Sequence, residues 1–268
     1  MDEPTSFLRR HEFLLRRLHS LSGLIPVGAF MCVHLVVNVS VLGGASIFQS
    51  NVDRIHSLGP LLPLVEWTFI FIPILFHALL GVVIIQGGLP NTTSYPTSGN
   101  IRYTVQRVTG MIAFVFIALH LAQMHGMAEP LRRFSDTWFA QFDPHAAASS
   151  AATTLQRSLA VQIFYAVGIL ACVYHLANGL WTMGITWGLW VGPVAQRRAG
   201  YVCGGFGLLF SVVGLAALAG MLRVDPPEAR AIEQRMEQAR EALRGEPSQA
   251  SPHKDPPSPD PTSPSTSN

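Results

Sequence analysis

The sequence predicts an all-α membrane protein with five transmembrane helices. Of its 268 residues, 49% are hydrophobic and 13% are charged, and the mean hydropathy is +0.32, which is high for a soluble domain. The apolar residues gather into five runs that each reach the roughly 20 residues needed to span a bilayer. These runs are 21–42, 61–86, 108–127, 159–187 and 201–222. Because backbone groups in hydrocarbon must bond within their own segment, each run is predicted to be a helix.

The predicted helices divide the chain into four regions. Residues 1–20 precede the first helix, and residues 21–222 form the five-helix bundle. Interleaved charges at 223–245 predict a polar helical tail, and the Pro- and Ser-rich composition of 246–268 predicts a disordered end. The connection 128–157, which contains AAASSAATT, is expected to be a surface loop with room for a short helix.

Arginines are unequally divided between the two sides of the predicted bundle. The segments before the first helix, between the second and third, and between the fourth and fifth hold eight arginines, against four in the opposite connections. The positive-inside rule therefore predicts a protein of the cytoplasmic membrane with its N-terminus in the cytoplasm and its C-terminal tail outside. The net charge of +2, with arginines scattered in pairs, argues against a nucleic-acid partner.

Each of the first four predicted helices contains one interior histidine, and the fifth contains none. These residues are His34, His77, His120 and His175. At a rise of about 1.5 Å per residue, His34 and His120 lie about 20 Å from the cytoplasmic face. His77 and His175 lie roughly 6–8 Å from that face, because their helices run in the opposite direction. The four histidines therefore form two pairs at two depths.

Two histidines at one level on different helices can bind a single haem iron from both sides. Two such pairs predict that the first four helices form a bundle around two haems, which would carry electrons along the membrane normal. The alternatives are histidines that hydrogen-bond between helices and a proton relay. A relay usually includes interior carboxylates, and Glu66 is the only acidic residue within any predicted span.

Four stretches of the sequence resemble those of one known protein family. They are FLLRRLHSLSGLIPVGAFMCVHLVVN, FIPILFHALLGVVI, VQRVTGMIAFVFIALH and YHLANGLWTMGITWG. In order, over about residues 7–220, the chain resembles the cytochrome b membrane-anchor subunit of succinate dehydrogenases and fumarate reductases, in the type with one large polypeptide and two haems. The resemblance implies that His77 and His175 bind one b haem near the cytoplasm, and that His34 and His120 bind the other near the outer side.

The resemblance also implies partners. A flavoprotein subunit and an iron–sulfur subunit would dock on the cytoplasmic face, and electrons would pass through the haems to a membrane quinone, typically menaquinone. The chain itself would hold no catalytic residue for succinate, in keeping with a sequence that lacks a Gly-rich nucleotide motif and a cysteine cluster. Two interpretations compete with this one: a dihaem cytochrome b of another quinone-linked dehydrogenase or hydrogenase, and a haem-free membrane scaffold.

Six further residues are candidates for contacts with haem or quinone. At the inner ends of the first and third helices, side chains that suit haem propionates are Arg17, His19, Ser20 and Arg107. The alternative for this group is a role in topology and helix capping. Glu66 and His125 lie near the outer ends of the second and third helices, where they are candidates for proton exchange or contact with quinone. The alternative for both is a surface position facing water.

Overall fold

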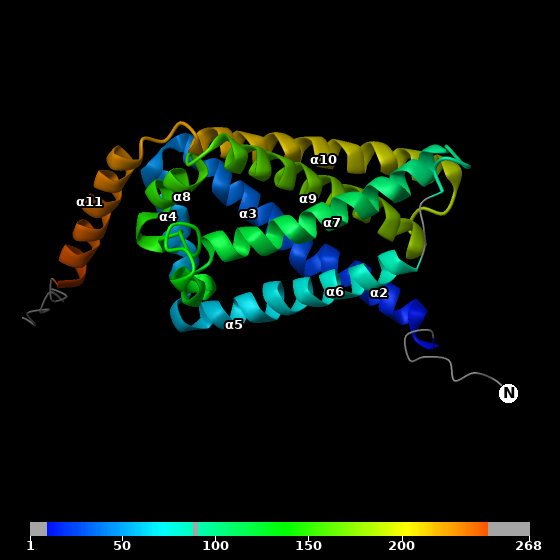
Figure 1. The fold of residues 1–268 in the computed structure, drawn as a ribbon, viewed down its shortest axis with the longest axis horizontal. Helices are drawn as coiled ribbons and strands as arrows, with labels where there is room; N and C mark the ends of the chain where they lie inside the picture. The colour runs from blue at the N-terminus through cyan, green and yellow to red at the C-terminus, as the bar shows by residue number, and fades with distance from the viewer. Residues whose placement is uncertain (1–9, 88–90, 246–268) are drawn as a thin grey trace, which may run out of the picture.

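The computed structural model describes residues 10–87 and 91–245, and within these ranges the chain forms helices and no strand. Five segments are long and apolar enough to cross a membrane, namely Glu12–Gly43, Gly59–Gln86, Ser98–Met124, Leu159–Thr186 and Pro193–Met221. The predicted all-α fold with five membrane-spanning helices is confirmed. Figure 1 shows these helices side by side in an elongated bundle, with the start of α2 at one end and α11 at the other. We call these ends the N-terminal end and the α11 end.

The first two spans each contain a π-helical turn close to a proline. The first span consists of α2 (Glu12–Ser22), η1 (Gly23–Gly28), α3 (Ala29–Val39) and η2 (Ser40–Gly43). The second consists of η3 (Gly59–Leu61), α5 (Leu62–Glu66), η4 (Trp67–Phe71) and α6 (Ile72–Gln86). Pro26 lies inside the π-helix η1, and Pro73 lies in the first turn of α6, directly after the π-helix η4. Because proline has no N–H, the wider turns accommodate the hydrogen bonds that a regular α-helix would lose there.

The other three spans are uninterrupted helices. They are α7 (Ser98–Met124), α9 (Leu159–Thr186) and α10 (Pro193–Met221). The side chains of Thr97 and Ser158 accept hydrogen bonds from the backbone N–H groups of Asn100 and Val161, which caps α7 and α9. The helix α7 begins well before the predicted run 108–127, because its capped first turns are polar and escape a search for apolar residues.

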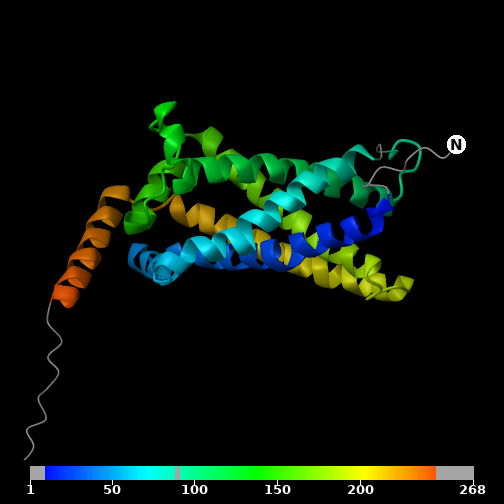
Figure 2. The same ribbon diagram turned by 90° about the horizontal axis from the view of Figure 1, so that it is seen from below.

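Shorter helices cover the α11 end. They are α4 (Ala45–His56), η5 (Gly126–Arg133), η6 (Pro144–Ala146), α8 (Ala147–Leu155) and α11 (Pro226–Gly245). Helices α4, α8 and α11 pack against one another, and we call these three the cap. The helix α8 confirms the expected short helix within 128–157. Ala147, Ala148 and Ala152 on it have no exposed surface, so the predicted surface position is wrong for this helix. Figure 2 shows α11 at the far end of the bundle from the first described residues.

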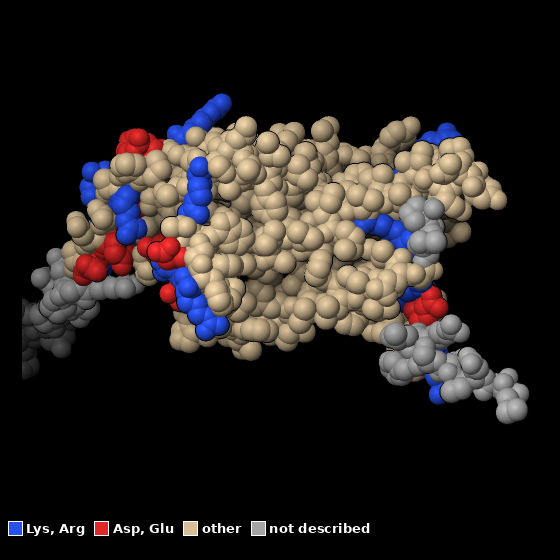
Figure 3. All heavy atoms as spheres, in the orientation of Figure 1, with Lys and Arg blue, Asp and Glu red and all other residues tan. Residues whose placement is uncertain are grey.

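The sides of the bundle are apolar and exposed. Large hydrophobic side chains on all five spans face outward, for example Phe30, Leu79, Ile163 and Leu208. On the face drawn in Figure 3, charged residues gather toward the two ends and leave a broad band between them without Lys, Arg, Asp or Glu. An exposed apolar band of this extent belongs in hydrocarbon, so the chain is a multi-pass membrane protein. The predicted disordered end, 246–268, lies outside the described residues.

Candidate functional site

The interior histidines from four different spans meet in two pairs. The ring centres of His77 on α6 and His175 on α9 are 6.0 Å apart, with ring planes at 84°. Those of His34 on α3 and His120 on α7 are 5.9 Å apart, with ring planes at 74°. The structure therefore brings together the same pairs that the helix rise predicts, the first toward the N-terminal end and the second toward the α11 end. Their role as metal ligands stays a prediction.

The spacing within each pair suits one metal ion held between two imidazoles. A ring nitrogen binds a transition metal at about 2 Å, which places the ring centre about 3 Å from the metal, so two opposed rings are about 6 Å apart. Among the described residues, no three His, Cys, Asp or Glu side chains gather into a metal cage. Two protein ligands per site fit a metal whose remaining ligands come from a flat macrocycle, as in haem.

Hydrogen bonds define which nitrogen faces inward in three of the four histidines. The Nδ1 atoms of His77 and His175 lie 2.8 Å and 3.0 Å from the backbone carbonyl oxygens of His19 and Gln106. A carbonyl oxygen only accepts, so both Nδ1 atoms carry the proton and each Nε2 keeps its lone pair for a ligand bond. This arrangement of a histidine held by a backbone carbonyl is typical of metal-ligating histidines.

In His120, too, Nδ1 is the ring nitrogen that carries the proton. Its Nδ1 lies 3.3 Å from the hydroxyl oxygen of Tyr165, and that hydroxyl donates to the side-chain oxygen of Gln123 at 2.8 Å. Because the tyrosine proton is used toward Gln123, the tyrosine oxygen accepts from His120. Tyr165 and Gln123 are both buried. The ring of His34 packs beside Phe30, with ring centres 5.5 Å apart.

A chain of polar side chains supports His175. The side-chain amide of Gln106 donates to the backbone oxygen of His175 at 3.0 Å, and its side-chain oxygen accepts from Asn178 at 2.9 Å. The oxygen of Asn178 in turn accepts from Nε of Arg102 at 2.9 Å. Sequence analysis did not predict this series of hydrogen bonds. Side-chain amides in membrane-spanning helices could have indicated it, because each amide needs a hydrogen-bond partner where water is absent.

Two glycines lie directly against the imidazoles of the pair at the N-terminal end. A methyl group on Gly110 would come within 2.8 Å of the ring of His175, and one on Gly23 would overlap the ring of His77. Both positions therefore exclude any side chain while the rings hold their places. The helices can approach the histidines closely only because these residues are glycines.

The four candidates for propionate contacts lie at the N-terminal end, but three of them are already engaged. Arg17 packs against Trp187 and donates to the carbonyl oxygen of Thr186, and Ser20 accepts from the Trp187 indole N–H. Arg107 donates to the carbonyl oxygens of Ile84 and Ile85 at 2.9 Å and 3.0 Å, where α6 ends. Arg107 therefore makes a helix-capping contact, which was the alternative to a propionate contact for this group.

His19 differs from the other three candidates. Its ring stacks on His77 with ring centres 4.0 Å apart and planes 8° from parallel. Its buried Nδ1 has no hydrogen-bond partner among the described residues. A buried polar atom without a partner is costly unless something else, such as a ligand, satisfies it.

Glu66 and His125 meet at the α11 end. The carboxylate of Glu66 lies 3.7 Å from Nε2 of His125, and the His125 ring also packs edge-on against Phe71. Nδ1 of His125 accepts from the backbone N–H of Met127, which leaves the other nitrogen directed at the carboxylate. Both side chains keep about a quarter to a third of their surface exposed (25% and 31%). Sequence reasoning placed both residues at this end but did not predict their contact.

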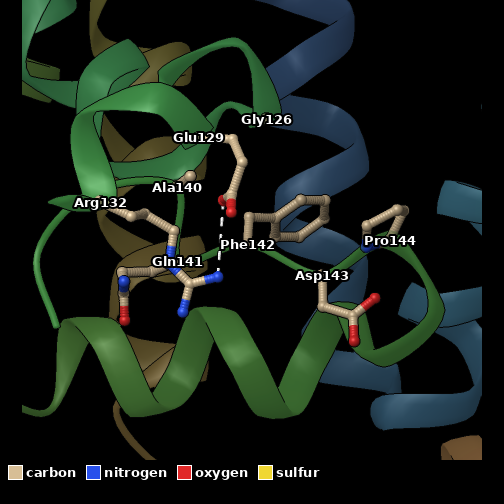
Figure 4. Close-up of a pocket in the computed structure, with 8 residues that line it drawn as sticks. All are labelled: Gly126, Glu129, Arg132, Ala140, Gln141, Phe142, Asp143 and Pro144. Carbon is tan, nitrogen blue, oxygen red and sulfur yellow. Dashed lines mark hydrogen bonds and ion pairs between the residues drawn. The ribbon is translucent and has the colours of Figure 1, made fainter. Parts of the chain in front are cut away.

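A cavity of about 450 Å³ lies among the connections at the α11 end. Figure 4 shows its lining side chains, with the ion pair between Glu129 and Arg132 across it and Phe142 and Asp143 beside it. None of the residues predicted as site residues lines this cavity.

Comparisons with known proteins assign the chain to a family. No protein-family model matches it. The succinate dehydrogenase cytochrome b558 subunit of Bacillus subtilis (strain 168) is 37% identical to it over 207 residues, which is 77% of this chain and 96% of that protein. Identity at this level over most of both chains reflects common descent. The chain therefore belongs to the family of succinate dehydrogenase cytochrome b subunits.

Proposed function

We propose that the chain binds two b-type haems, one between His77 and His175 and one between His34 and His120. The observation that carries the proposal is the pair of ring distances near 6 Å, each on a pair of helices from different parts of the chain. A haem held in this way supplies a one-electron carrier with both axial positions filled, which suits electron transfer rather than oxygen binding. Membership of a cytochrome b family supports the same cofactor.

The protein's contribution is to hold three of the four imidazoles, those of His77, His175 and His120, in one tautomer and one orientation. The carbonyl oxygens of His19 and Gln106 and the hydroxyl of Tyr165 accept the Nδ1 protons, which makes the opposite nitrogen a better donor to a metal. Of the four candidates for propionate contacts, His19 has the strongest support, because its buried Nδ1 has no partner among the described residues.

The two haem sites would conduct electrons between a soluble enzyme and the membrane pool of quinone. The iron–sulfur and flavoprotein subunits would dock at the N-terminal end. The excess of arginines in the segments at that end, counted against the opposite connections between spans, supports a cytoplasmic position for it, with the chain in the cytoplasmic membrane. The His77–His175 site lies nearer that end, and the His34–His120 site would pass electrons on to quinone, menaquinone by the family resemblance, at the α11 end. The chain would also anchor the soluble subunits.

Glu66 and His125 are the groups best placed to exchange protons with that quinone. Their contact of 3.7 Å joins a carboxylate to an imidazole nitrogen, and both groups reach the surface. A proton taken up or released by quinone could be held on Glu66 and stabilised by the His125 N–H. Electron transfer at the pair His34 and His120 and proton exchange would then occur at the same end of the bundle.

Haem stoichiometry tests the proposal. The purified full chain, produced with haem supplied, is expected to contain two b haems per polypeptide by reduced-minus-oxidised spectroscopy and haem extraction. Replacing His56, which bonds to the carbonyl oxygen of Val52 on α4, with alanine is the matched control and leaves both haems in place. A folded chain without haem would revive the interpretation as a scaffold, and one haem would mean that one histidine pair is structural.

Replacing Gln106 with alanine tests the polar chain behind His175. The backbone carbonyl still holds Nδ1, so haem is retained, but the loss of the amide contacts to His175 and Asn178 loosens the ligand. We expect the midpoint potential of one haem to shift by about 30–60 mV, equivalent to about 1 kcal/mol for one electron. Redox titration measures it. The control is Gln141→Ala, whose amide bonds to the carbonyl oxygens of Asp136 and Phe139 in the connection before α8. An unchanged potential in Gln106→Ala would show that these polar side chains only pack the helices.

Replacing Glu66 with glutamine tests proton exchange with quinone. The amide keeps the shape but cannot take up a proton, so quinone-linked turnover is expected to fall about 10²-fold. Succinate oxidation with an artificial acceptor, and both haem spectra, should remain as in the unmodified complex. Glu129→Gln, which alters an ion pair at the same end, is the control. Equal turnover in the two variants would remove Glu66 from the proton path.

A further inference from the structure

A long cavity lies between α9 and the N-terminal half of α10, beside the start of α7. Its volume is about 1070 Å³. Along α10 its lining runs from Pro193 to Ser211, which corresponds to about 27 Å at about 1.5 Å per residue. One leaflet of a bilayer contributes about 15 Å of hydrocarbon. The cavity therefore extends from the interface at the N-terminal end through the depth of one leaflet.

The deeper part of the cavity is a groove with small walls. On α10 it is lined by Gly200, Gly204 and Gly207, and a methyl group built on Gly204 would meet no atom within 4 Å. The facing wall on α9 includes Val173 and Ala177. An apolar groove with glycines along one wall fits a flexible hydrocarbon chain.

The mouth of the cavity is cationic. Arg102 and Arg197 line it, and among the described residues of the lining there is no Asp or Glu. The guanidinium of Arg102 lies 3.7 Å above the ring of Trp181 and bonds through Nε to Asn178. These contacts fix its orientation, and its Nη1 lies 3.9 Å from the position of a methyl group on Gly200 inside the groove. Fixed guanidinium groups bind phosphate oxygens strongly and with defined geometry.

From this combination we infer that the cavity binds one anionic phospholipid of the leaflet at the N-terminal end. Its phosphate lies between Arg102 and Arg197, and an acyl chain follows the glycines of α10. A free phosphate would leave the apolar groove unfilled, and a quinone, whose head group is neutral, would leave two guanidinium groups without an anion. Basic pockets between membrane helices commonly hold anionic lipids in this way.

The lipid site is connected to His175. Arg102 bonds to Asn178, Asn178 bonds to Gln106, and Gln106 bonds to the backbone oxygen of His175. A phosphate on Arg102 therefore acts on the electrostatics of the helix turn that carries His175. This part of the inference rests on the proposed function, because a haem at His175 is needed to observe it. Lipid binding itself does not.

The first experiment measures lipid retention without reference to haem. The full chain in detergent is mixed with phosphatidylglycerol or with phosphatidylcholine, and native mass spectrometry counts bound lipid. One phosphatidylglycerol is expected per chain, and phosphatidylcholine should bind far less. Arg197→Gln removes one cation at an exposed position, and Gly204→Leu fills the groove where a side chain has room. Each is expected to weaken binding about five- to tenfold or more.

Two matched variants complete the design. Arg198→Gln changes the neighbouring arginine, and Gly205→Leu the neighbouring glycine, neither of which lines the cavity; both should keep the lipid. Equal retention in all four variants, equal binding of phosphatidylcholine, or displacement by inorganic phosphate would overturn the inference. In haem-loaded protein, adding phosphatidylglycerol should also shift the potential of the haem at His175. If lipid is retained as expected but no haem is present, the proposed function fails and the lipid site stands.

Discussion

Replacing His175 with alanine is expected to remove one of two spectrally distinct b haems and to leave the other in place. His77→Ala should remove the same haem, because the two imidazoles face each other at 6.0 Å and neither alone supplies both axial bonds. His34→Ala and His120→Ala should both remove the other haem, for the same reason. Low-temperature difference spectra of the four variants resolve the two components.

Activity separates the two sites further. Any of the four replacements should lower succinate–quinone turnover at least about a hundredfold, because each interrupts the only path proposed between the two ends of the bundle. His34→Ala should leave succinate oxidation with an artificial acceptor intact, whereas His77→Ala is expected also to loosen the soluble subunits at the N-terminal end. The control is His145→Ala, at an exposed position in the connection before α8. If His34→Ala and His77→Ala removed the same haem, the pairing would be wrong.

The pairing could be expected from sequence because membrane spans constrain depth. A helix that crosses a slab of fixed thickness converts residue number into height, so His34 and His120 could be assigned one level and His77 and His175 another. Helix rotation is not constrained in that way. The sequence therefore could not say which ring face meets which, nor that His19 would stack on His77. Gly81, which lies against the His19 ring, leaves room for that contact.

Other features escaped prediction because they depend on partners far away in the chain. The Ala-rich segment that became α8 has the composition of a solvated loop, and small side chains give no amphipathic signal. It is buried because α4 and α11 pack over it. The polar tail likewise showed interleaved charges, but nothing indicated that one of them, Glu233, would be 1% exposed beneath the helix. A pattern of interleaved charges indicates a helix exposed to water, but it does not show which of the charged residues is buried.

Glu233 is the residue that joins α11 to α8. Its carboxylate accepts from the backbone N–H groups of Ala148 and Ser149 at 2.7 Å and 3.1 Å, and from the Ser149 hydroxyl at 2.5 Å. These N–H groups belong to the first turn of α8, which has no side-chain cap of its own. A negative charge at the start of a helix also interacts favourably with the helix dipole. A residue 84 positions away thus caps this helix.

Replacing Glu233 with alanine should therefore loosen the contact between α11 and the first turn of α8. The change leaves two buried N–H groups without an acceptor, which costs about 2 kcal/mol or more. We expect the amide protons of Ala148 and Ser149 to exchange about thirtyfold faster, as measured by hydrogen–deuterium exchange. Glu241→Ala, which removes an exposed carboxylate from the same helix, should change nothing. Unaltered exchange in the Glu233 variant would mean that packing alone holds α8.

The Glu233→Ala variant is also expected to affect the proposed haem site at His34 and His120. Ala148, Ala151 and Leu155 of α8 belong to one buried cluster with Phe116 and Tyr165, and the Tyr165 hydroxyl holds Nδ1 of His120. Loosening α8 thus removes packing from the residue that orients a proposed haem ligand. We expect Glu233→Ala to broaden or shift the spectrum of the haem at His34 and His120 while that at His77 and His175 stays unchanged. A shift of both haems alike would instead indicate that the whole bundle had loosened.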